Sequence, residues 1–90
     1  MTPAKKTIQS HIDFYIENQC EWVDVEYRGS DWKLTSEQYP EEDTANFYFN
    51  NGKKGYVIFT KPVFHNPNPD NEYSYPILQS AKVMDIEEEA

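Results

Sequence analysis

Residues 21–34 read EWVDVEYRGSDWKL, and this stretch predicts a β-hairpin over about 21–35. Every second residue in its first half is apolar (VxVxY), so a strand there has one apolar face. Asp24 and Glu26 fall on the opposite, acidic face. The turn-forming residues RGSD follow, and the alternation resumes at Trp32.

The residues before this hairpin predict an amphipathic helix over about 3–19. Pro3 suits the first helical position, where a missing backbone N–H costs nothing. The apolar residues that share one stripe at helical spacing are Ala4, Ile8, Ile12, Tyr15 and Ile16. We therefore expect this stripe to pack against a sheet.

A second hairpin is predicted over about 46–61. The segments NFYFN and GYVIFTK are rich in strand-forming residues, and the intervening NNGKKG is a strong turn signal because Asn and Gly tolerate positive φ. Between the two hairpins, the polar residues 36–44 predict a loop that contains Pro40.

The last third of the chain is less regular. Residues 65–71 predict an exposed loop, and 72–86 form a last strand region in which Pro76 favours an edge position. Within it, 81–86 fits a strand or a short helix, with strand preferred. Residues 87–90 predict a frayed acidic tail.

Together these elements predict one domain of the α+β class. An N-terminal helix would pack on a twisted antiparallel sheet of four to six strands built from hairpins. A chain of 90 residues supports a single modest core. Five Phe, seven Tyr and two Trp would supply most of its apolar area.

The charge is strongly acidic, with 16 Asp and Glu against 8 Lys and Arg and a formal net charge of -8. Direct binding to nucleic acid or to an anionic membrane requires a basic surface, so the composition argues against both and favours a basic partner. The single cysteine, Cys20, excludes an intrachain disulfide, and no apolar run resembles a signal peptide or a membrane span. We expect a cytoplasmic protein.

No motif that carries chemistry is present. His11, Cys20 and His65 are isolated, whereas a zinc site needs three or four ligands in short spacings. The chain has three glycines and lacks a phosphate-binding loop or a nucleophile elbow. The sequence therefore predicts no metal, no cofactor and no catalytic residues.

Carboxylates recur at regular intervals along the predicted elements. Asp13, Glu17 and Glu21 would line up about 6 Å apart if the helix extends to Glu21. Asp24 and Glu26 would share a strand face at about 6.7 Å. Rows at this spacing present a charge pattern similar to that of DNA phosphates. The candidate partner-binding residues are Asp13, Glu17, Glu21, Asp24, Glu26, Glu37, Glu41, Glu42 and Asp43.

Two functions follow from this pattern. The first is a small acidic inhibitor that mimics DNA charge and occupies the basic surface of a nuclease or DNA-binding protein, as anti-restriction, anti-CRISPR and nucleoid-directed products of phages and mobile elements do. Exposed rings such as Trp22, Tyr39 or Tyr73 would anchor the contact.

The alternative is an interaction module, such as an immunity protein, an adaptor or an oligomerising subunit, that binds through a sheet edge or an aromatic patch. In either case a two-fold homodimer would join two acidic faces into a longer strip.

Overall fold

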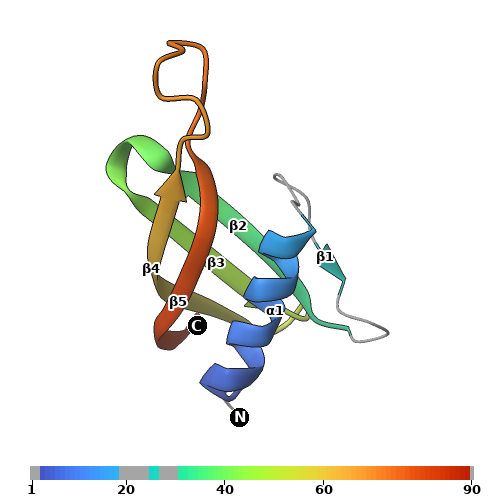
Figure 1. Cartoon of the computed structure of the whole chain (residues 1–90). Coiled ribbons are helices and arrows are strands. Elements are labelled where there is room, and N and C mark those ends of the chain that lie inside the picture. The colour runs from blue at the N-terminus through green and yellow to red at the C-terminus, as the bar shows by residue number, and fades with distance from the viewer. Residues whose placement is uncertain (1–2, 19–24, 27–30, 90) are drawn as a thin grey trace.

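The computed structural model describes residues 3–18, 25–26 and 31–89. In that part of the chain one α-helix is followed by one antiparallel sheet, in which strands adjacent in sequence are also adjacent in space. Figure 1 shows α1 lying against one side of this sheet, which confirms the α+β class. The elements are α1 (Lys5–Glu17), β1 (Val25–Glu26), β2 (Lys33–Tyr39), the 3-10 helix η1 (Pro40–Glu42), β3 (Thr44–Asn50), β4 (Gly55–His65) and β5 (Ile77–Glu89).

The core lies between α1 and the sheet. Alternate residues of the middle strands point toward the helix, as the period-two pattern predicts. Two of the contacts are edge-to-face ring pairs, Tyr15 with Phe47 and His11 with Phe49, at centroid distances of 5.6 and 5.0 Å. The buried apolar residues are Ile8, Ile12, Tyr15, Leu34, Ala45, Phe47, Phe49, Tyr56, Ile58, Leu78, Ala81 and Val83.

The helix is shorter than the predicted range of about 3–19. Ala4 is its N-cap in an extended conformation, so Pro3 precedes the helix instead of occupying its first position. At the other end, the backbone N–H of Asn18 and its side-chain amide both donate to the carbonyl of Phe14, at 3.1 and 2.8 Å. The first is the last i to i−4 bond of the helix, and the second adds a side-chain donor to the same carbonyl, with Asn18 as the C-cap.

Both predicted hairpins are present in the described residues. Val25 lies opposite Leu34 and Glu26 opposite Lys33, while residues 19–24 and 27–30 lie outside the described part of the chain. The second hairpin has longer strands than predicted, 44–50 and 55–65 in place of 46–61 overall. Gly52 occupies positive φ in its turn, at 91°, which agrees with the turn signal.

The prediction of a loop over 36–44 was wrong. Strand β2 continues to Tyr39 and β3 begins at Thr44, so the connection is only Pro40 to Asp43. The prediction was wrong because the second half of β2 consists mainly of polar residues, which are typical of loops. Ser36 is buried on the helix side of the sheet because its hydroxyl bonds with that of Tyr15, at 2.5 Å.

The predicted boundaries at the C-terminal end also need correction. The loop runs from 66 to 76, longer than 65–71, and the last strand is 77–89 instead of a region over 72–86. The strand preference for 81–86 is confirmed. Residues 87–89 do not form a frayed tail, because β5 pairs them with Val57, Tyr56 and Gly55 of β4. Charged residues are common on edge strands, where they discourage further pairing.

Strand β5 contains two β-bulges against β4. Phe59 lies opposite Asp85 while Thr60 lies opposite Val83, so Met84 is an extra residue. The second register shift, between Val63 and Phe64, makes Gln79 an extra residue in the same way. The bulges allow β5 to keep its apolar residues on the core side over 13 residues.

The outer edge of β5 is covered by side chains of α1. The Gln9 amide donates to the Ala81 carbonyl at 2.9 Å and accepts from the Val83 N–H at 2.7 Å, as a residue of a neighbouring strand would. Lys5 Nζ donates to the Met84 carbonyl at 2.9 Å. These bonds occupy the backbone groups to which another strand would otherwise add.

Strands β4 and β5 continue past the N-terminal end of β3 as a two-stranded ribbon. The last residue of β4 paired with β3 is Phe59, whereas pairing with β5 extends to His65. We call residues 61–80, the ribbon and its loop, the arm. Figure 1 shows the loop of the arm projecting at the end of the molecule opposite the N-terminal end of α1. Pro62 lacks an N–H, which weakens strand addition along the free side of β4.

The Gln9 contacts generate the first testable prediction. Gln9→Ala leaves the Ala81 carbonyl and Val83 N–H without their partner, so we expect a loss of about 1–2 kcal/mol in the free energy of unfolding. Urea denaturation measures this change. The matched control is Gln79→Ala, an exposed glutamine on β5 itself, which should change stability by less than about 0.5 kcal/mol. Equal effects at the two positions would contradict the structural role of Gln9.

Candidate functional site

The interior polar groups hold the fold together and offer no reactive site. The Tyr15 and Ser36 hydroxyls bond to each other with both side chains buried, 1% and 4% exposed. The ring Nδ1 of His11 donates to the Thr7 carbonyl at 2.6 Å, and the ring packs edge-to-face on Phe49. A substrate has no access to these groups, so we assign them to packing.

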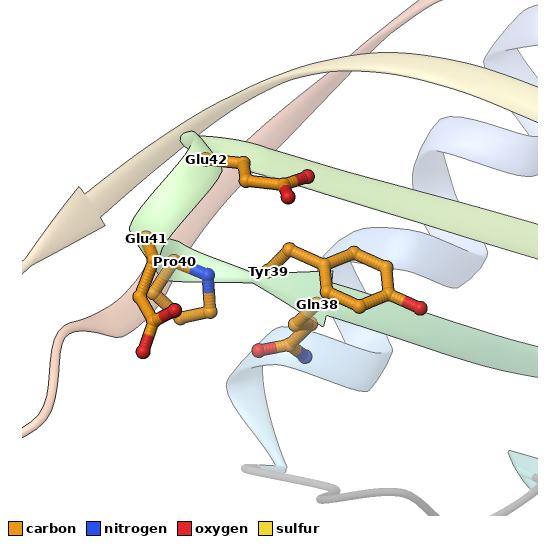
Figure 2. A pocket seen from close by; sticks show the side chains of 5 residues that line it. All are labelled: Gln38, Tyr39, Pro40, Glu41 and Glu42. Atoms are coloured by element: carbon orange, nitrogen blue, oxygen red, sulfur yellow. The ribbon is translucent and has the colours of Figure 1, made fainter.

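The pocket beside the β2–β3 connection is small. Figure 2 shows it at η1, where Glu41 and Glu42 point in different directions and the ring of Tyr39 extends along β2. Its volume is about 190 Å³ and it is open to solvent. Drug-sized ligands typically occupy pockets of roughly 300–1,000 Å³. Among the described residues no group of three or more His, Cys, Asp or Glu is placed to hold a metal ion.

The predicted carboxylates lie on different sides of the fold. Asp13 and Glu17 are exposed on α1, whereas Glu37 belongs to the face of the sheet that points away from α1, one residue from the buried Ser36. Two of them take part in hydrogen bonds. Asp13 accepts from the Gln9 amide at 2.9 Å, and Glu37 accepts from the Tyr48 hydroxyl at 3.1 Å.

The remaining predicted carboxylates fall into two groups. Glu41, Glu42 and Asp43 come together in and directly after η1, where Asp43 adopts a left-handed conformation with φ 54°. Asp tolerates that region better than most residues, which gives Asp43 a structural explanation. Glu26 lies opposite Lys33 in the β1–β2 register, and Glu21 and Asp24 lie outside the described residues.

Among the described residues, the three most exposed large apolar side chains lie on the arm, while Met84 of β5, 52% exposed, lies outside it. Tyr73 and Tyr75 in its loop are 77% and 81% exposed, and Ile77 and Val63 in its strands are 56% and 49% exposed. Tyr39, at the end of β2, is 47% exposed. The expectation of exposed rings at Tyr39 and Tyr73 is confirmed, and Trp22 lies outside the described residues. An exposed apolar group of this kind is typical of a protein-binding surface.

The loop of the arm is organised by its own asparagines. Asn66 Oδ1 accepts from the Asn68 N–H at 3.1 Å and from the Ser74 hydroxyl at 2.6 Å. Asn71 Oδ1 accepts from the Tyr73 N–H at 2.9 Å. Asparagine side chains form such local turns readily. The two tyrosines are therefore presented from an ordered loop, which lowers the entropy cost of a contact.

The sequence contained a partial signal for this site. An Asn- and Pro-rich loop of unusual length was visible, but its size was predicted as 65–71, which left Tyr73 and Tyr75 in a strand. The two tyrosines at alternate positions looked like one face of that strand. The extension of β4 beyond β3 depends on strand register, which local patterns do not encode.

No protein-family model, curated protein sequence or solved structure matches this chain. The described part of the chain contains no helix that is both long enough and apolar enough to cross a membrane.

The role of Asn66 can be tested directly. Asn66→Ala removes the acceptor shared by Asn68 and Ser74, so the loop amides should exchange with deuterium faster while the free energy of unfolding changes by less than about 0.5 kcal/mol. Amide exchange followed by NMR measures both. Asn66→Asp is the control because it keeps the Oδ1 acceptor and should keep the protection. If Ala and Asp behave alike, the side chain does not order the loop.

Proposed function

We propose that this chain is a small, cytoplasmic, non-catalytic binding protein that contacts a basic partner protein through its arm. The observation that carries the proposal is the grouping of Tyr73, Tyr75 and Ile77 as exposed apolar side chains on one projection. Tyrosine is enriched among residues that dominate binding energy because it combines a large apolar area with a hydroxyl.

The charge supports a basic partner for the same contact. The formal net charge is -8, and Asp70 and Glu72 are exposed within the loop that carries Tyr73 and Tyr75. Carboxylates around an aromatic contact accelerate association with a positively charged surface, while the rings determine how long the complex lasts. An arm with this composition suits an inhibitor, an immunity protein or an adaptor.

Contact through the loop of the arm is better supported than strand addition at β5 or along the free side of β4. Gln9 and Lys5 occupy outward backbone groups of β5, and Pro62 interrupts the free side of β4. A strand adding at either place would lose hydrogen bonds already made or find a donor missing.

A tyrosine variant tests the proposal. The protein is immobilised and exposed to lysate at low salt, retained proteins are eluted with a salt gradient, and the specific partner is identified by mass spectrometry. Tyr73→Ser combined with Tyr75→Ser should then weaken the purified partner's affinity by at least about 30-fold, because the loss of even one hot-spot ring costs about 2 kcal/mol. Isothermal calorimetry measures the affinity.

Tyr39→Ser is the matched control for this experiment. It removes a half-exposed ring at the β2–β3 connection, outside residues 61–80, and contact through the arm predicts that it leaves the affinity unchanged. Both variants should unfold at nearly the wild-type temperature, since exposed side chains contribute little to stability. A double tyrosine variant with wild-type affinity would refute the arm as the contact.

A second candidate function is mimicry of DNA charge, in which the chain occupies the nucleic-acid-binding surface of a nuclease or DNA-binding protein. The observation that favours it is the cluster Glu41, Glu42 and Asp43, which stands at one connection beside Tyr39. This function makes Glu41 and Glu42, and not the tyrosines of the arm, responsible for the affinity.

Charge reversal separates the second candidate from the first. Under mimicry, Glu41→Lys combined with Glu42→Lys should abolish binding, wild-type protein should displace DNA from the partner, and affinity should fall steeply with salt. Gel-shift competition and calorimetry at several salt concentrations measure these effects. Glu41→Gln with Glu42→Gln serves as an intermediate control. Retained binding by the lysine variant, together with no displacement of DNA, would exclude mimicry through this cluster.

A further inference from the structure

The side of the sheet opposite α1 is not covered by any helix of the described residues, and we call its β4–β5 part the open face. Side chains alternate along β4, so Tyr56 and Ile58 are buried against the helix while Val57, Phe59, Lys61 and Val63 belong to the open face. Their partners on β5, in the same order, are Glu87, Asp85, Lys82 and Ser80.

The charges of the open face are arranged in an unusual order. Lys61 lies directly opposite Lys82, a like-charge pair that destabilises an isolated sheet. One step along the ribbon, Asp85 lies opposite Phe59. Among the described residues neither lysine forms an ion pair, and the Asp85 carboxylate accepts only the backbone N–H of Ile86 at 2.9 Å. Within the described part of the chain, the two lysines and the carboxylate therefore have no ion-pair partner.

We propose that the open face binds the open face of a second copy of this chain, with the two β4–β5 ribbons antiparallel. A two-fold axis that runs across the strands at the level of Thr60 places Asp85 of one copy over Lys82 of the other, and the reverse. Two symmetry-related ion pairs then neutralise charges that have no ion-pair partner among residues 3–18, 25–26 and 31–89. This interface goes beyond the proposed function, because it does not use the tyrosines of the arm's loop.

The apolar residues match under the same operation. The axis brings Val57 of one copy over Val63 of the other, which is 49% exposed in the single chain. It also brings Phe59, 41% exposed, over the aliphatic stem and ammonium group of Lys61. Sheets pack in this aligned manner with a core about 10 Å thick. The contact thus combines an apolar centre with flanking charge pairs.

The charges select this orientation over the alternative. If the two-fold axis ran parallel to the strands between β4 and β5, Lys61 of each copy would lie over Lys82 of the other. That arrangement would place four lysines together, at a cost of several kcal/mol typical of like charges in an interface. A parallel arrangement of the ribbons is therefore excluded by electrostatics, and the antiparallel one is favoured.

The turn before β4 and the loop of the arm also carry charged residues, at the two ends of the β4–β5 ribbon. Lys53 and Lys54 lie in the turn before β4, and Asp70 and Glu72 lie in the loop at the far end of the arm, all four exposed. In the antiparallel dimer, the lysine turn of one copy faces the acidic loop of the other.

Charge reversal tests the dimer. Sedimentation velocity over a broad concentration series, at physiological ionic strength, gives the dissociation constant of the wild-type dimer. Asp85→Lys should raise that constant by at least about tenfold, because two attractive contacts become repulsive, and Lys82→Asp should do the same. The double variant Asp85→Lys, Lys82→Asp re-forms the pairs in reverse and should restore the constant to within about threefold.

Glu17→Lys provides the control for a general charge effect. It changes the formal net charge of -8 by the same two units as Asp85→Lys, but Glu17 is an exposed residue of α1 and not part of the open face. General repulsion between acidic copies predicts that both variants associate more strongly. The open-face dimer predicts weaker association for Asp85→Lys alone. A wild-type chain that stays monomeric throughout the series, or a double variant that fails to recover while folded, overturns the proposal.

Discussion

The docking of α1 across the sheet is the contact on which the rest of the structure depends. Ile8, Ile12 and Tyr15 bury the apolar side of the sheet, while Gln9 bonds the outer edge of β5 as a neighbouring strand would. One helix thus supplies the second layer of the core and also protects an edge. The helix and Pro62 restrict strand addition at β5 and along the free side of β4, while the open face and the arm stay exposed.

The sequence predicted those parts of the fold that depend on local patterns. The turn at Gly52 and the alternation beside it determine the second hairpin without help from distant residues. Strand β5 was harder to predict from sequence, because its core-facing residues are irregularly spaced. These residues are Leu78, Ala81, Val83 and Ile86, at intervals of three, two and three. The two bulges cause this spacing, which resembles a helical period and explains why 81–86 fitted both a strand and a helix.

The candidate site was predicted less well, because surfaces depend on how elements pack. Carboxylate spacing within a helix or strand can be calculated from sequence, but Asp13 and Glu37 belong to opposite layers. The buried Ser36 is another example, since only the distant Tyr15 hydroxyl makes a polar residue acceptable at that point. The arm arises because β4 has 11 residues and β3 has seven. No local pattern encodes this difference in strand length.

The open face and the arm have compatible roles. Two chains with a formal charge of -8 repel each other at a distance, but salt screens this repulsion beyond about 8 Å, so the order of charges at contact decides the outcome. Contact through Phe59 and Asp85 leaves Tyr73 and Tyr75 outside the centre of the interface. The antiparallel arrangement then directs the two arms to opposite ends of the dimer. A partner with repeated sites would be held by both arms, and the second contact would form at high effective concentration.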